Sequence, residues 1–119
     1  MTVDLLKENG INVDCGLELL GDLDLYNETL GDFLEEAESR LPKMEAYLEN
    51  NDMPNYAILA HSHKSDSKYL GFTKLAELSY QHEMESKANN VSFIQAHYQE
   101  LVDETNRIVE IVKKYLGRL

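Results

Sequence analysis

The residues best suited to chemistry in this chain lie in one stretch, YAILAHSHKSDSKYLGF, at residues 56–72. Histidine is substantially neutral near physiological pH, so His61 can offer a nitrogen lone pair to an electrophile. Lys64 and Lys68 follow at helical spacing and share one side of a helix with His61. An accessible imidazole beside two ammonium groups is suited to receiving a phosphoryl group.

The apolar pattern of the same stretch predicts that His61 faces solvent. Tyr56, Leu59, His63 and Leu70 recur at three- and four-residue steps, with one turn skipped, as on the buried face of a helix. At about 100° per residue, His61 lies roughly 200° around the helix from His63. We therefore expect His61 on the outer face.

The elements that carry this stretch are predicted to be helices. Apolar residues recur at helical steps from Tyr26 to Leu48, and again from Val91 to Tyr115. The first pattern stays in phase across Pro42, which predicts a kinked but continuous helix. No stretch alternates with a period of two, so a sheet is not expected.

Polar residues and glycines divide the chain into these helices. Asp52 is predicted to cap the helix that carries His61, and Gly71 is predicted to end it. Thr73 is expected to cap the next helix, and Asn89 and Asn90 are expected to end that helix and cap the last. The sequence therefore predicts an all-α fold, an up-and-down antiparallel four-helix bundle over residues 24–117.

Length and composition indicate one domain over residues 1–119. Residues 1–22 are interrupted by glycines, and we expect them to form a loose arm with one short helix. A single cysteine permits no internal disulfide and favours a reducing compartment.

Charge and hydropathy bear on the class of partner. With 22 acidic and 11 basic residues, the formal charge of −11 opposes nonspecific binding to nucleic acid or to an anionic membrane. No apolar run has the length of a membrane span, and the first residues lack the features of a signal peptide. We expect a cytoplasmic monomer.

The sequence around His61 resembles the histidine phosphotransfer (HPt) family of bacterial phosphorelays. The family motif runs His-x-Leu-Lys-Gly/Ser, with a glycine ten residues after the histidine; here residues 61–65 read HSHKS and Gly71 follows. The flanking stretches GLELLGDLDLYNETLGDFLEEA and LAELSYQHEMESKANNVSFI also fit the family pattern. The resemblance thus extends over nearly the whole chain.

The resemblance implies a role for each matching residue. His61 corresponds to the phosphorylated histidine, and Lys64 to the lysine that offsets phosphate charge. Ser65 stands where the family keeps a small residue, so that the aspartate of a partner can approach. Gly71 corresponds to the turn glycine. Glu83 corresponds to a carboxylate or amide that hydrogen-bonds the imidazole, although its position also suits an ordinary surface carboxylate.

The resemblance also implies the partners, which are response-regulator receiver domains and a hybrid sensor kinase. The expected docking face surrounds His61 on the second and third helices of the bundle and comprises Ala57, Ile58, Ser65, Lys68, Ala76 and Tyr80. The chain has no glycine-rich nucleotide loop and no carboxylate cluster suited to Mg²⁺. We therefore expect no cofactor on this chain, and expect the receiver to supply the phosphoryl group and the metal.

Two histidines depart from the family pattern, because His63 and His82 stand where leucine or isoleucine is usual. We expect them to face each other at the boundary of the core, with pKa values below the ordinary 6.5 or so. Two other functions remain open. One is a receiver-binding adaptor of the same fold without phosphotransfer. The other is a metal-binding bundle that uses both histidines with His97 or a carboxylate.

Overall fold

The computed structural model describes residues 2–118, and every regular element within that range is a helix. Four long helices, α3 (Leu23–Glu49), α4 (Met53–Leu70), α5 (Thr73–Lys87) and α6 (Val91–Leu116), form the bundle. The expected all-α class is confirmed. The arm contains two short helices, α1 (Asp4–Glu8) and α2 (Val13–Leu20), where one was expected.

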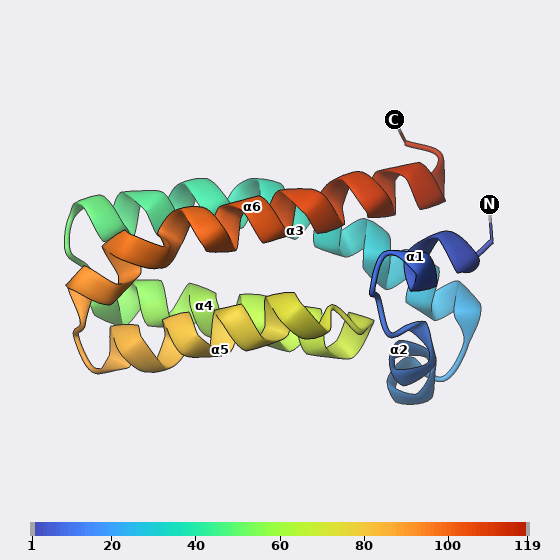
Figure 1. Ribbon diagram of the computed structural model, residues 1–119, viewed down its shortest axis with the longest axis horizontal. Coiled ribbons are helices and arrows are strands. Elements are labelled where there is room, and N and C mark those ends of the chain that lie inside the picture. Colours follow the sequence, from blue (N-terminus) through green and yellow to red (C-terminus); the bar gives the residue numbers. More distant parts are fainter. Residues whose placement is uncertain (1, 119) are drawn as a thin grey trace.

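The bundle has two layers. Figure 1 shows α3 beside α6 in one layer and α4 beside α5 in the other, and α3 also packs on α4 and α5 on α6. A helix of 27 residues such as α3 is about 40 Å long, which accounts for the 41 Å long dimension of the molecule. Since α4 and α5 are shorter, α3 and α6 extend past them at the end where α1 and α2 lie. No helix in residues 2–118 is long and apolar enough to cross a membrane.

The predicted apolar patterns form the core. Tyr26, Leu30 and Phe33 of α3 are buried, and so are most pattern residues of the other long helices, whereas Leu59, Val91 and Tyr98 are half-buried. Pro42 lies inside α3, which continues through it. The hydroxyl of Tyr98 on α6 donates to a carbonyl just before this proline, at 3.1 Å.

Two of the three predicted N-caps are confirmed. The carboxylate of Asp52 and the side-chain oxygen of Asn90 each accept a hydrogen bond from the backbone N–H three residues later. The prediction for Thr73 is wrong, because α5 is capped by Phe72, which makes no side-chain cap bond. The Phe72 ring is buried, 5.0 Å from the ring of Phe33, so packing fixes this helix start.

The turn between α4 and α5 depends on Gly71, which has a φ of 83°. Its N–H donates to the carbonyl of Lys68, and the N–H of Phe72 donates to that of Ser67 at 2.8 Å, the Schellman arrangement. The Gly71 carbonyl accepts from the N–H of Asn12 at 2.8 Å, and an added Cβ would overlap the Asn12 carbonyl. Gly71 is therefore required both by its backbone angle and by close contact with the arm.

The arm is fixed to this end of the bundle by further contacts. The hydroxyl of Tyr26 donates to the carbonyl of Leu70 at 2.8 Å, and the Tyr26 ring leaves no room for a Cβ at Gly16. Arg107 of α6 donates to the carbonyl of Asn9 at 3.0 Å. Tyr26 belongs to α3, so α3 bonds the end of α4 directly, whereas the arm packs on Tyr26, bonds to α6, and reaches the turn after α4 through Asn12.

The side chain of His63 is fully buried in a polar network, so its expected place at the core boundary is wrong. Its Nδ1 lies 2.9 Å from the guanidinium of Arg40, and a guanidinium can only donate. The ring proton therefore lies on Nε2, which donates to the hydroxyl of Thr105 at 2.9 Å. Arg40 also contacts the carboxylate of Asp66 at 2.8 Å, so the network joins α3, α4 and α6.

His82 is also inside the core, where its Nδ1 lies 2.8 Å from the hydroxyl of Tyr56 and its Nε2 has no hydrogen bond of normal geometry. Burial lowers the pKa of His63 to about 3, with smaller contributions from Arg40 and His82. Burial likewise lowers the pKa of His82 to about 4, although the backbone of His97 opposes this. The expected direction of both shifts is confirmed.

We predict that Gly71→Ala destabilises the fold by about 2 kcal/mol or more, because it adds a clash with the arm to the cost of a left-handed backbone. The matched control is Gly10→Ala, whose φ of 82° is nearly the same but whose added Cβ meets nothing within 4 Å. That variant should lose only about 1 kcal/mol. Urea unfolding measures both, and equal losses would contradict the contact with the arm.

A second prediction concerns the loss of folding stability at low pH. Since both folded pKa values lie below the unfolded value of about 6.5, the unfolded chain binds more protons, and stability falls as pH decreases from 6.5 toward 4 and 3. The double variant His63→Asn/His82→Asn keeps a polar group near each Nδ1 but cannot titrate. The free energy of unfolding of this variant should change less steeply with pH, by up to about 1.4 kcal/mol per pH unit for each histidine. Urea unfolding from about pH 8 to about pH 5 checks this, and an unchanged slope would refute it.

Candidate functional site

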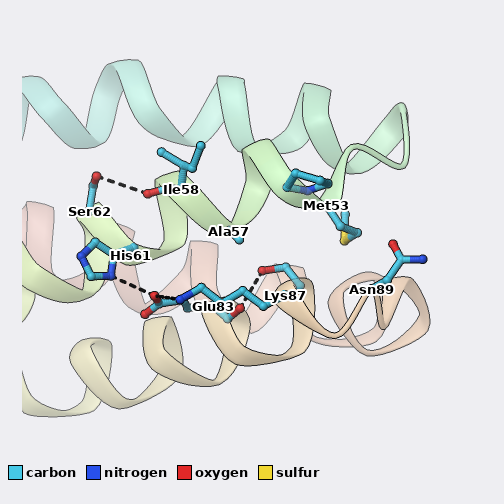
Figure 2. A pocket seen from close by; sticks show the side chains of 10 residues that line it. Met53, Ala57, Ile58, His61, Ser62, Glu83, Lys87 and Asn89 are labelled. Atoms are coloured by element: carbon cyan, nitrogen blue, oxygen red, sulfur yellow. Dashed lines mark hydrogen bonds and ion pairs between the residues drawn. The ribbon is translucent and has the colours of Figure 1, made fainter.

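His61 lies on the outer side of α4, with 57% of its side chain exposed, as predicted. Its Nδ1 is 2.8 Å from Oε2 of Glu83 on the neighbouring helix α5, and Figure 2 shows the imidazole and the carboxylate directed toward each other. Only 3% of the Glu83 side chain is exposed. The alternative in which Glu83 is an ordinary surface carboxylate is therefore wrong.

Two lysines neutralise this buried carboxylate. The ammonium of Lys87 lies 2.8 Å from Oε2, the oxygen that also contacts His61. The ammonium of Lys64 lies 2.7 Å from Oε1, in an ion pair whose geometry is not that of a hydrogen bond. Burial alone would raise the pKa of Glu83, but the two lysines and the imidazole lower it to about 2. Glu83 is therefore ionised at neutral pH.

The ionised carboxylate determines which ring nitrogen of His61 carries the proton. A carboxylate accepts hydrogen bonds and cannot donate them, so Nδ1 must be the donor to Glu83. In the neutral ring, the lone pair then lies on Nε2. Nε2 has no hydrogen-bond partner in the part of the chain that the structure describes. An exposed nucleophilic nitrogen is therefore presented on the outer face of α4.

The two lysines differ in their freedom to move. Lys64 is 25% exposed, and its ammonium also lies over the ring of Tyr80, 5.5 Å from the centroid. Lys87 is 58% exposed, and among the described residues its ammonium forms an ion pair with Glu83 alone. Lys87 was missed in the sequence analysis. Its position four residues after Glu83 on one helix was the signal that could have identified it.

A groove of about 670 Å³ lies beside His61 between α4 and the end of α5. Its apolar lining includes Met53, Ala57 and Ile58, and Figure 2 shows Met53 and Ala57 on the side of α4 that faces α5, which carries Lys87. Ala57 is nearly buried, whereas 62% of Ile58 is exposed. The groove thus offers apolar surface next to the nucleophile.

The other residues predicted for the docking face do not line this groove. They lie farther along α4 and α5, on the side of His61 toward Gly71. Tyr80 and Lys68 are exposed there, and Ser65 and Ala76 are half-buried. The predicted face is therefore in two parts, with His61 between them.

The charge of −11 is unevenly distributed. Residues 53–87, which form α4 and α5, contain four acidic and four basic side chains, so the entire net charge lies in the rest of the chain. The basic side chains near His61 are Lys64, Lys68 and Lys87. The face that presents the nucleophile is therefore much less negative than the rest of the surface, which favours the approach of an anionic group.

The described residues offer no site for the metal-binding alternative. Among residues 2–118, no group of three or more histidine, cysteine, aspartate or glutamate side chains is arranged to hold a metal ion. His63 and His82 contact side chains of α3, α4 and α6 through their ring nitrogens. The ring of His97 packs at a tilt against that of Phe93, with ring centroids 4.3 Å apart, and its Nδ1 lies 3.9 Å from the carboxylate of Glu100.

Comparison with known proteins gives one match. A protein-family model described as the Hpt domain matches residues 28–111, which run from α3 to α6 and include His61 and Glu83. No curated protein and no solved structure matches the chain. The arm of α1 and α2 precedes the matched region.

We predict that Glu83 sets the tautomer of His61. In the unmodified protein the neutral ring should carry its proton on Nδ1, and in Glu83→Ala this preference should be lost because Glu83, the acceptor at Nδ1 among residues 2–118, is removed. Imidazole ¹⁵N chemical shifts measure the tautomer directly. Glu77→Ala, at an exposed position of the same helix, is the matched control. An unchanged tautomer in Glu83→Ala would contradict the prediction.

Proposed function

The chain belongs to the Hpt domain family, and on that premise we propose that it is a phosphocarrier with His61 as its acceptor. Hpt domains transfer phosphoryl groups through histidine in phosphorelays and have no kinase activity of their own. In this proposal the chain accepts a phosphoryl group from the aspartate of one receiver domain and passes it to another. The observation that carries it is the hydrogen bond from His61 to the buried, ionised Glu83.

This hydrogen bond supports the proposal because it prepares the ring before a partner arrives. With Nδ1–H held by Glu83, the ring is oriented and the lone pair on Nε2 points away from the carboxylate. No general base is needed, because the attacking nitrogen carries no proton. A ring with the opposite tautomer would have to lose a proton before it could attack.

The transfer step follows from this arrangement. Nε2 attacks phosphorus in line with the bond to the aspartate oxygen of the receiver. The N–P bond forms as the P–O bond breaks, and the electron pair leaves with the aspartate carboxylate. The proton on Nδ1 stays in place, so the phosphorylated ring is an imidazolium that faces the carboxylate of Glu83. The reverse step delivers the phosphoryl group to a second receiver.

The surroundings of the ring fit a receiver domain as the partner. The small side chains of Ala57 and Ser65 leave room for the approach of an aspartyl phosphate, and the groove beside Ile58 provides apolar contact. We assign the Mg²⁺ that phosphoryl transfer requires to the receiver, and a hybrid sensor kinase is the proposed source of the phosphoryl group.

Incubation with a phosphorylated receiver domain tests this function. The unmodified protein should acquire label that is labile in acid and stable in base, as expected for phosphohistidine, and His61→Gln should acquire none. The matched control His97→Gln, on a half-exposed histidine of α6, should accept label normally. Absence of label on the unmodified protein, with binding retained, would favour the adaptor function. Label in His61→Gln but not in His63→Gln would show that the acceptor was assigned wrongly.

A further inference from the structure

One oxygen of Glu83 holds two groups that change during the proposed reaction. Oε2 lies 2.8 Å from Nδ1 of His61 and 2.8 Å from the ammonium of Lys87. Oε1 lies 2.7 Å from the ammonium of Lys64. When the imidazole is neutral, as attack by Nε2 requires, one carboxylate faces two cations.

Phosphorylation changes this balance of charge. When Nε2 attacks, the ring becomes an imidazolium whose N–H still contacts Oε2, so a new cation appears at the oxygen that already holds Lys87. Two cations on one carboxylate oxygen repel each other. At the same time, a phosphoryl dianion appears on the other side of the ring. Glu83 then faces three cations, one more than before, while the two lysines nearest the phosphoryl group are both paired with the carboxylate.

We propose that Lys87 leaves Glu83 when His61 is phosphorylated and pairs with the phosphoryl oxygens. This inference rests on the phosphocarrier function proposed above. Lys64 stays with Oε1 and keeps the carboxylate in place, while the imidazolium replaces Lys87 at Oε2. Glu83 thus exchanges the ammonium of Lys87 for the imidazolium of His61, and the released ammonium stabilises the negative charge of the phosphoryl group.

The structure distinguishes Lys87 from Lys64 in three ways. Lys87 shares its oxygen with the ring and Lys64 does not. Lys87 is 58% exposed and Lys64 only 25%, with the ammonium of Lys64 also held over Tyr80. Lys87 lines the groove beside His61, whereas Lys64 does not. In this proposal Lys64, which the family resemblance led us to expect as the lysine that offsets phosphate charge, is the fixed cation, and Lys87, outside the motif, is the mobile one.

A kinetic comparison of lysine variants tests this division. Lys87→Met should keep the Nδ1–H tautomer in the unphosphorylated protein, because Lys64 still holds Glu83, but should accept the phosphoryl group about tenfold more slowly. One charge-assisted contact in the transition state is expected to have an effect of this size. Lys87→Arg should recover most of the rate. Lys74→Met, at a 69% exposed lysine of the same helix, is the matched control and should transfer normally.

A spectroscopic readout follows the lysine itself. With ¹⁵N-labelled lysine, phosphorylation of His61 should shift the ammonium signal of Lys87 more than that of Lys64. A normal transfer rate in Lys87→Met, or a larger shift at Lys64, would overturn the inference. Altered tautomer in Lys87→Met would also overturn it, since the lysine would then act by positioning Glu83.

These outcomes are separate from the test of the function. If the unmodified protein accepts no label on His61, the phosphocarrier function fails and the inference fails with it. If it accepts label at a rate that Lys87→Met matches, the function stands and only the role of Lys87 is refuted.

Discussion

The contact on which the site depends is the hydrogen bond between Nδ1 of His61 and the buried carboxylate of Glu83. Burying a carboxylate costs several kcal/mol unless it is paired and hydrogen-bonded. Here two hydrogen bonds, from His61 and Lys87, and an ion pair with Lys64 surround it, and its pKa is lowered to about 2 despite burial. The contacts that keep Glu83 ionised also fix the proton of His61 on Nδ1. One set of contacts therefore both stabilises a buried charge in the folded protein and leaves the lone pair of Nε2 free to attack.

That contact requires α4 and α5 to be in register, and the turn at Gly71 sets the register. His61 lies ten residues before Gly71 and Glu83 twelve residues after it. At 1.5 Å per residue, both are about 15–18 Å from the turn, so the antiparallel helices bring them level. The backbone angle of Gly71 and the hydrogen bond from Asn12 hold the turn itself. The arm, far from the nucleophile, therefore supports its geometry through the end of α4.

The spacing of apolar residues, with the polar residues and glycines that end each helix, predicted the bundle because each long helix has a regular apolar face. The exposure of His61 was predictable because its position in the sequence places the ring opposite that face. Other features depend on tertiary context. The absence of a side-chain cap at Thr73 follows from burial of its neighbour Phe72. Arg40 is buried because the imidazole of His63 in the core needs a hydrogen-bond donor at Nδ1. This pairing joins two helices, so the apolar pattern of a single helix could not predict it. Lys87 was visible as a local ion pair, but its second contact at His61 required the fold.

The position of α4 is specified by polar contacts on two sides. Toward α5 it is joined through His61 and Glu83, and toward α3 through His63 and Arg40, with hydrogen bonds of 2.8 and 2.9 Å. Apolar packing alone tolerates small shifts of a helix, because one apolar side chain can replace another at the same contact. A shift of α4 by one turn would move His61 from Glu83 and His63 from Arg40 together, leaving a buried carboxylate without the imidazole donor and a buried guanidinium without its imidazole acceptor. His63, which stands where the family has leucine, therefore disfavours the one-turn shift of α4. That is the same shift that would separate His61 from Glu83.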